Sequence, residues 1–231
     1  MKLVLATRNQ GKVLELTEML RCHQSQAVCD SSDTSLVGNR EPITLTTSSS
    51  TDNFAQARVL GQNQYEVISL NAYPDAPEVV EDGKTYMENA VKKASVIAEY
   101  TGYLALADDA GLEVDALNGA PGIHSKRWAG EDATDAIRIA KLLQALEGVT
   151  DRRARFVAAI AIVHPDTTSE GVLGVCEGRI RHAPVGESGF GYDPVFVPDG
   201  YDQTFAELGE EIKNQISHRA KALEKAREWL L

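Results

Sequence analysis

The sequence predicts an α/β layered fold with a mixed β-sheet, and three features carry that prediction. The short apolar run Lys2–Ala6 indicates a buried strand. Apolar residues at helical spacing follow it from Val13 to Leu20, so a strand leads directly into a helix. Two long β-rich runs, 155–164 and 171–181, flank a Pro-Asp-Thr hairpin signal. Strand-to-helix connections together with a hairpin give both parallel and antiparallel pairs.

The other elements follow from short apolar runs and amphipathic stripes. The shorter strand segments are 66–70, 104–107, which ends at Asp108, and 112–114 beyond Gly111. Three further helices are expected from their apolar stripes and end signals: 86–101 before Gly102, 136–146 between a cap at Asp132 and a stop at Gly148, and the last helix after a cap at Ser217. Residues 183–194 form a loop rich in glycine and proline.

Composition restricts the class of protein. The 231 residues are 43% hydrophobic and 25% charged, which is ordinary for a globular protein. A formal charge of −11 repels a nucleic-acid backbone. No apolar run approaches the ~20 residues that a membrane-spanning helix needs. The start of the chain lacks a secretory signal and the three cysteines form no CxxC pair, so we expect a cytoplasmic protein with no membrane and no nucleic-acid partner.

One segment breaks the alternation of strands and helices. From Cys22 to Asn53 the chain is rich in serine and threonine, sparse in charge and without a strand or helix period. Such long structureless stretches are unusual inside a compact domain. We interpret residues 21–66 as a Ser/Thr-rich surface insertion within a single domain spanning 1–231.

The loop Thr7–Lys12 has the features of an anion site. It lies between a strand and a helix, where free backbone N–H groups point outward. Lys12 falls in the first helical turn, where the helix dipole disfavours a cation. The spacing of a Walker A loop is absent. Taken alone, the loop is better explained as a capped surface turn with a solvated lysine than as an anion site.

The last helix shows the same electrostatic mismatch. His218 and Arg219 follow the cap at Ser217, and Lys213 lies just upstream. Cations at a helix N-terminus cost a few tenths of a kcal/mol each, which an exposed side chain tolerates. Because the mismatch occurs twice, we expect that a bound anion, such as a polyphosphate, compensates it. Arg219 would then serve the ligand and not the fold.

Acidic residues offer a metal site. Asp108 and Asp109 follow a predicted buried strand, and the carboxyl ends of strands face the ligand crevice in α/β sheets. Paired carboxylates are suited to Mg²⁺, although two solvated caps at a turn are about as plausible. Glu81 has no local partner and is a further ligand candidate, whereas Glu88 belongs to the capping box that begins at Thr85.

An aromatic loop completes the set of candidates. Phe190 lies between Gly189 and Gly191, and an exposed ring in such a loop can stack on a nucleobase. A ring tucked against the edge of the core is the ordinary alternative.

Together these segments resemble the inosine/xanthosine triphosphate pyrophosphatases. Six segments occur in that family's order and approximate spacing over nearly the whole chain except about residues 21–66: TRNQGK at 7–12, GKTYMENA at 83–90, ADDAGL at 107–112, GAPG at 119–122, GFGYDP at 189–194, and Lys213 with SHR at 217–219. The resemblance implies an elongated two-lobed α/β fold around a long mixed sheet flanked by helices, and a homodimer. It also implies Mg²⁺-dependent hydrolysis of ITP, dITP or XTP to the monophosphate and pyrophosphate, which clears non-standard purines from the nucleotide pool.

The resemblance also assigns roles to individual residues. Asp109 matches the general base and metal ligand, with Glu81 and Asp108 as the other metal acids. Substrate-binding positions are Thr7, Arg8, Asn9, Gln10, Gly11, Lys12, Ala110, Phe190, Gly191, Tyr192, Asp193, Lys213, His218 and Arg219. Many members have serine at the position of Ala110, so one hydroxyl contact to the substrate is missing here.

Two other functions stay open at this point. A kinase or ATPase could use the loop Thr7–Lys12, although the Walker spacing is missing. A nucleotide-binding module without catalysis is the other alternative, which the acidic pair Asp108-Asp109 disfavours.

Overall fold

The computed structural model describes residues 1–29 and 65–230, and the strands of this part form one mixed sheet. The order across the sheet is β2-β1-β3-β4-β5-β6. The strands are β1 (Lys2–Leu5), β2 (Glu66–Ser69), β3 (Leu104–Val114), β4 (Arg153–Val163), β5 (Ser169–Ile180) and β6 (Phe196–Pro198). β1 pairs in parallel with β2 and β3, and the remaining pairs are antiparallel. The predicted mixed sheet and the β4–β5 hairpin are confirmed.

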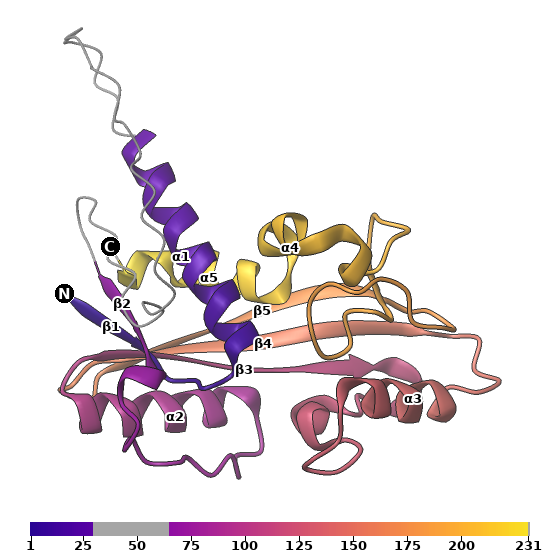
Figure 1. Ribbon diagram of the computed structural model, residues 1–231, viewed down its shortest axis with the longest axis horizontal. Coiled ribbons are helices and arrows are strands. Elements are labelled where there is room, and N and C mark those ends of the chain that lie inside the picture. Colours follow the sequence, from indigo (N-terminus) through magenta and orange to yellow (C-terminus); the bar gives the residue numbers. More distant parts are fainter. Residues whose placement is uncertain (30–64, 231) are drawn as a thin grey trace, which may run out of the picture.

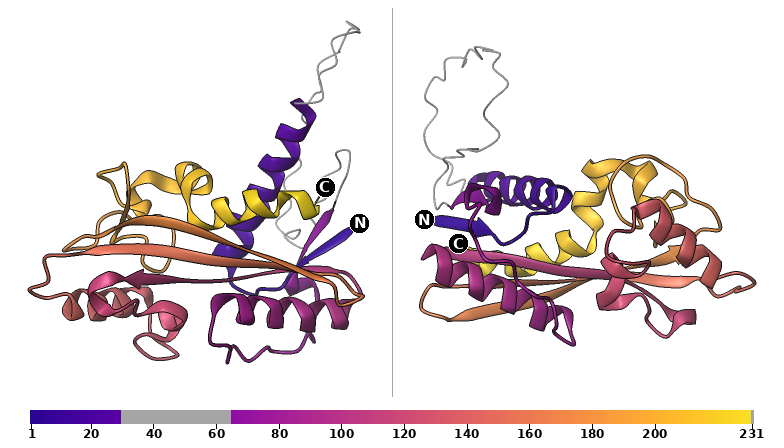
Figure 2. Two further views of the ribbon diagram at one scale, coloured as in Figure 1. Left: turned by 180° about the vertical axis from the view of Figure 1, so that it is seen from behind. Right: turned by 60° about the horizontal axis from the view of Figure 1, so that its bottom comes forward.

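Helices cover both faces of this elongated sheet (Figure 1). On one face lie α1 (Gln10–Cys29), α4 (Phe205–Ile216) and α5 (His218–Leu230), and on the other lie α2 (Tyr86–Thr101) and α3 (Asp135–Ala145). Short 3₁₀ helices are η1 (Leu70–Ala72), η2 (Asp115–Leu117) and η3 (Gly122–Arg127). The views in Figure 2 show the N-terminal strands with α2 at one end of the long strands and α3 towards the other.

Side-chain alternation on the strands separates two layers of the core. Leu104 and Leu106 of β3 pack with the layer of α1 and α5, whereas Ala105 and Ala107 pack with α2. The pleat sends successive side chains to opposite faces of a sheet. A third cluster, around Phe156 and the start of α4, fills the other end of the molecule.

Several predicted boundaries were wrong. β3 does not end at Asp108 but continues to Val114, because β4 pairs with it from Ala105 to Val114. The cap of α3 is Thr134 and not Asp132, and the helix ends at Ala145, before Gly148. α1 extends to Cys29, inside the segment predicted to be structureless. The remainder of that predicted insertion, residues 30–64, lies outside the described residues.

The predicted end of α2 and the predicted start of α5 are confirmed, whereas α4 is an additional helix. Gly102 caps α2 with φ 68°, in the left-handed region that glycine adopts readily. Ser217 Oγ accepts a hydrogen bond from the backbone N–H of Ala220 at the start of α5. α4 was not predicted, although its capping box of Thr204 and Glu207 is visible in the sequence. Among the described residues, no helix combines the length and apolar character needed to cross a membrane.

Candidate active site

The candidate site is a pocket of about 500 Å³ where the edge of β3 becomes free. β1 ends at Leu5, which pairs with Leu106, whereas β3 continues for eight further residues. The carbonyl oxygen of Asp108 at this free edge accepts a hydrogen bond from Lys93 Nζ at 2.8 Å. The pocket therefore lies beyond the carboxyl end of β1, where the rule for α/β sheets places ligands.

The pocket brings together most of the predicted site residues. Those that line it are Thr7, Arg8, Asn9, Lys12, Glu81, Asp109, Ala110, Phe190, Gly191, Tyr192, Asp193, Lys213, His218 and Arg219. Gln10, Gly11 and Asp108 do not line it. Asn9 starts α1 by accepting the backbone N–H of Lys12 through Oδ1. Both residues line the pocket, so this helix N-terminus borders it.

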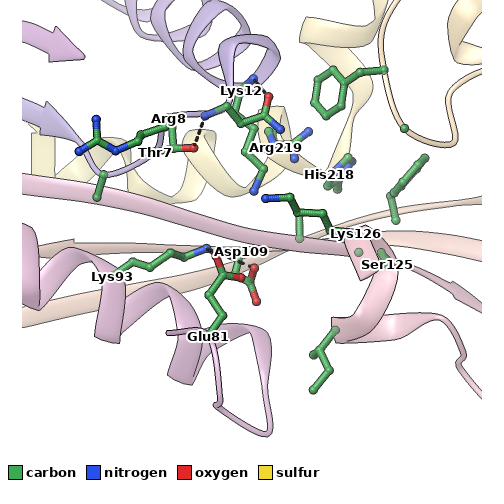
Figure 3. Close-up of a pocket in the computed structure, with 18 of the residues that line it drawn as sticks. Thr7, Arg8, Lys12, Glu81, Lys93, Asp109, Ser125, Lys126, His218 and Arg219 are labelled. Carbon is green, nitrogen blue, oxygen red and sulfur yellow. Dashed lines mark hydrogen bonds and ion pairs between the residues drawn. The ribbon is translucent and has the colours of Figure 1, made fainter. Parts of the chain in front are cut away.

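Asp109 lies on the α2 side of the sheet. Its Oδ2 accepts a hydrogen bond from Asn89 Nδ2 at 3.1 Å, and its Oδ1 lies 3.3 Å from Lys93 Nζ. The same ammonium lies 3.3 Å from Glu81 Oε1. Figure 3 shows Glu81, Lys93 and Asp109 converging at one side of the pocket. The loop of Glu81 is fixed by Arg127, which donates to the Glu81 carbonyl at 3.1 Å.

Burial dominates the electrostatics of Asp109. It raises the pKa of Asp109 against the opposing charges of Lys93 and Lys12. Glu81 is less buried, and there the charges of Lys93 and Lys12 overcome burial and lower its pKa. Burial by itself would lower the pKa of Lys93, but Asp109, Asp108 and Glu81 raise it, so the lysine stays charged. A carboxylate with a raised pKa beside a fixed cation suits a general base.

The expected grouping of Asp108 with the other two acids needs correction. Asp108 is the next residue on the same strand, so its side chain points to the opposite face, towards α1 and α5. There its carboxylate lies 2.9 Å from Lys12 Nζ and 2.9 Å from Arg219 Nε. Burial opposes its ionisation, but Lys12 and Arg219 hold the pKa of Asp108 well below its usual range.

The ion pairs of Asp108 continue as a buried chain of alternating charges. Arg219 Nη1 lies 3.0 Å from Glu15 Oε2, Glu15 Oε1 lies 2.5 Å from Lys213 Nζ, and Lys213 Nζ lies 2.5 Å from Asp193. The carboxylates thus compensate the cations around the start of α5. The prediction that a bound anion compensates Arg219, and that Arg219 serves only the ligand, was wrong, because Glu15 and Asp108 already pair with it.

The aromatic loop around Phe190 packs against the loop Thr7–Lys12. A methyl group on Gly11 would lie 2.7 Å from Phe190 Cδ1, so only glycine allows this approach. The Phe190 ring centroid lies 4.6 Å from Lys213 Nζ and 5.4 Å from Arg219 Cζ. Asp193 is buried and accepts the backbone N–H of Phe190 at 2.9 Å. Tyr192 is buried too and donates its hydroxyl to the Ser125 carbonyl at 3.0 Å.

His218 is a buried and electrically neutral member of the pocket. It is 2% exposed, and its ring stacks on Phe156 with centroids 4.7 Å apart. Burial, with Arg219 and Lys213 nearby, moves the pKa of His218 well below its usual value. Its Nδ1 makes no hydrogen bond within the described part of the chain. A buried polar atom without a partner facing a pocket indicates a contact made with a ligand.

Sequence reasoning missed several residues that line the pocket, chiefly Lys93 and Lys126. Lys93 left a signal, because it lies in the apolar stripe of α2, four residues after Asn89, which is buried too. Lys126 lies on η3, a segment without a sequence pattern, and left none. Figure 3 shows Lys12 and Lys126 extending into the pocket opposite Glu81 and Asp109.

The structure offers two carboxylates and not a complete metal cage. No cluster of three or more His, Cys, Asp or Glu side chains suited to a metal occurs in residues 1–29 and 65–230. Glu88 is occupied as a cap, since its Oε2 accepts the backbone N–H of Lys84. Glu81 and Asp109 share one cation, so their oxygens lie close together. Mg²⁺ is commonly held by one or two carboxylates with substrate phosphates and water, and this pair fits that arrangement.

Comparison with known proteins decides the family. The Ham1 family model matches residues 3–229. This chain belongs to the Ham1 family. It is 47% identical to a dITP/XTP pyrophosphatase of Desulforamulus reducens, over 100% of this chain and 96% of the relative. A dITP/XTP pyrophosphatase of Streptomyces coelicolor is 41% identical over 96% of this chain and 92% of its own length.

Solved structures of Ham1 proteins have the same fold. A HAM1 protein from Coxiella burnetii aligns with a TM-score of 0.76 at 36% identity, covering 100% of this chain and 98% of that one. The Ham1 protein of Staphylococcus aureus gives a TM-score of 0.73 at 35% identity, with the same coverage. The predicted elongated fold around a long mixed sheet is confirmed.

Proposed function

We propose that this Ham1 protein hydrolyses the non-standard purine nucleoside triphosphates ITP, dITP and XTP to the monophosphate and pyrophosphate. One observation carries the proposal: a single pocket has cations and a helix N-terminus at one end, and at the other an aromatic loop with His218, whose Nδ1 has no hydrogen-bond partner within the described residues. The first end suits a triphosphate and the second a purine. Two relatives of nearly the same length are named dITP/XTP pyrophosphatase.

The cationic end binds the triphosphate. Lys12 and Lys93 approach the free edge of β3 from its two sides, and each is directed at the Asp108 carbonyl. Lys126 is exposed and lines the same pocket. The backbone N–H groups at the start of α1 add uncharged donors, which favour anions at helix N-termini. Thr7, Arg8, Asn9 and Lys12, the residues of this loop that line the pocket, then surround the phosphate chain.

Glu81 and Asp109 would hold Mg²⁺ together with the substrate phosphates. When bound, the ion neutralises charge that develops on the phosphate oxygens. Lys93 keeps the two carboxylates together at 3.3 Å from its ammonium. Mg²⁺ bound to substrate phosphates keeps several water ligands, so two carboxylates from the protein suffice.

Asp109 acts as the general base of the hydrolysis. Its carboxylate is fixed by Asn89 and Lys93, and it accepts a proton from the attacking water at the pocket side of β3. The water attacks the α-phosphorus and pyrophosphate leaves. Asp108 has a different role, which is to pair with Lys12 and Arg219 and so to fix both cations.

The aromatic end recognises a 6-keto purine. Phe190 offers a ring for stacking, and Lys213 and Arg219 lie under that ring. A 6-keto purine has an acceptor at O6 and a donor at N1, the reverse of adenine. Arg219 and Lys213 have only donors, and neutral His218 has one donor and one acceptor. Adenine would present a donor to these donors and would not match His218, whose Nδ1 has no partner among the described residues, and such mismatches discriminate by large factors.

Pyrophosphate release from ITP, dITP, XTP, ATP and GTP, with and without Mg²⁺, tests the proposal. We expect pyrophosphate from the first three, only in the presence of Mg²⁺, and much less from ATP. Orthophosphate in place of pyrophosphate would favour the kinase or ATPase alternative. Binding of ITP without any turnover would favour a nucleotide-binding module.

The family resemblance extends this proposal to the assembly. We infer a homodimer of a single 1–231 domain, acting in the cytoplasm, where nucleoside triphosphates are made and used. Light scattering gives the mass of the particle in solution, and a value near 25 kDa, the mass of one chain, would exclude the dimer.

A further inference from the structure

Two carboxylates hold the aromatic loop by consecutive backbone N–H groups. Asp193, inside the loop, accepts from Phe190. Asp135 accepts from Gly191 at 2.7 Å, although it lies 56 residues away in the sequence. Asp135 is the first residue of α3 and lines the same pocket. The loop is therefore tied to α3 and not only within itself.

The Asp135 carboxylate is itself fixed. Arg138 Nη2 donates to its second oxygen, Oδ1, at 2.8 Å, and Arg138 Nη1 donates to the Lys126 carbonyl at 3.1 Å. Thr134 caps the helix beneath it by accepting from Ile137. A rigid helix end thus presents one free carboxylate oxygen, which meets Gly191. The Tyr192 hydroxyl, bonded to the Ser125 carbonyl, ties the same loop to η3 at a second point.

The loop needs such a tie. Gly189 and Gly191 both have positive φ, 78° and 65°, and glycine gives a backbone many competing conformations. Phe190 lies between them, so its ring is only as well placed as its backbone. Hydrogen bonds to a carboxylate are stronger than neutral ones, and this bond is short. Arg138 compensates the negative charge, which would otherwise repel a triphosphate in the same pocket.

We propose that Asp135 is a positioning residue that holds Phe190 where its ring stacks on the purine. The inference rests on the proposed function. Asp135 acts through Gly191 on the base end of the pocket and leaves the phosphate end, around Lys12 and Lys93, unchanged. Its removal lowers the affinity for the base and not the rate of the chemical step.

Asp135→Ala is compared with Asp132→Ala, which removes an exposed acid three residues earlier that does not line the pocket. For Asp135→Ala we expect KM for ITP to rise about tenfold, the effect of one lost charge-assisted hydrogen bond, with kcat within about twofold. Tripolyphosphate has no base, so its inhibition constant stays within about twofold of the wild type. Asp132→Ala should leave all three values unchanged.

Asp135→Asn keeps an acceptor oxygen of the same reach without the charge, so KM should rise only about threefold. Equal rises in KM for ITP and in the inhibition constant of tripolyphosphate would show general damage to the pocket and overturn the proposal. So would an Asp135→Ala enzyme indistinguishable from Asp132→Ala, or loss of the folded protein in both Asp135 variants. A wild-type enzyme that does not hydrolyse ITP would instead refute the proposed function.

Discussion

Asp108 and Asp109 are neighbours on one strand, yet their surroundings differ in almost every respect. Asp108 faces α1 and α5, where Lys12 and Arg219 contact it directly and its side chain is inaccessible to solvent. Asp109 faces α2, lines the pocket and shares Lys93 with a second carboxylate, Glu81. The pKa of Asp108 is lowered, mainly by Lys12 and Arg219 against burial, whereas burial raises that of Asp109.

This difference separates a structural charge from a reactive one. On the Asp108 side three carboxylates (Asp108, Glu15 and Asp193) share three cations (Lys12, Arg219 and Lys213), so the charges balance and the ionised state is secured by the fold. On the Asp109 side two carboxylates compete for one lysine, so negative charge remains for a cation brought with the substrate. Adjacent acids in a sequence therefore need not form one site, because the pleat of a strand sends them to opposite layers.

Replacing Asp109 is expected to have the largest effect. Asp109→Asn removes the base and one metal ligand, and we expect kcat for ITP to fall about 1000-fold, or about 4 kcal/mol, with the melting temperature nearly unchanged. Asp82→Asn, at an exposed acid paired with Lys92, is the matched control and should retain full activity. More than about a tenth of the wild-type kcat in Asp109→Asn would remove Asp109 from its assigned role.

The variant Arg219→Gln tests whether the buried ion pairs around Asp108 stabilise the fold. This change leaves Asp108 and Glu15 buried with too few cations, so the free energy of unfolding should fall by about 3 kcal/mol. Arg179→Gln removes an exposed arginine whose partner Asp202 is exposed as well, and its effect should stay within about 0.5 kcal/mol. Chemical denaturation measures both variants. Equal stability of Arg219→Gln and the wild type would mean that the buried ion pairs do not support the fold.

His218, next to Arg219 in the sequence, makes the free energy of unfolding depend on pH. Since its pKa is lowered in the folded state by burial, the unfolded chain binds a proton below about pH 6.5 that the folded chain does not. Stability from this group is thus complete above that pH and falls by about 1.4 kcal/mol between pH 7.5 and 5.5. His218→Gln should flatten the unfolding free energy over that window. An unchanged slope would show that His218 is protonated in the folded protein.

The smallest expected effect concerns Lys126, which lines the pocket that also contains Glu81 and Asp109. Lys126→Met should raise KM for ITP and the inhibition constant of pyrophosphate about fivefold each, about 1 kcal/mol, because an exposed lysine contributes modestly to phosphate binding. Lys84→Met, at an exposed lysine that does not line the pocket, should change neither. A rise in KM for ITP alone would place Lys126 at the base and not at the phosphates.

Most of the secondary structure and most of the site residues were accessible from the sequence. Strand and helix periods, the caps at Thr85 and Ser217 and the stop at Gly102 are local properties, and the structure has them where the sequence places them. The segments at 7–12, 107–112 and 189–194 likewise identified residues that share one pocket. These features depend on neighbours within a few positions, which the sequence contains in full.

The tertiary structure alone decided which charges meet. Glu15, Asp108, Lys213 and Arg219 come from three helices and a strand, and only their packing shows that they pair with one another and not with a ligand. Buried carboxylates at close range outweigh there a helix dipole worth a few tenths of a kcal/mol, so the dipole does not decide what compensates Arg219. The tie between Asp135 and Gly191 was equally invisible, since it joins segments 56 residues apart. Electrostatic compensation acts through space, and a sequence gives no distances between its distant parts.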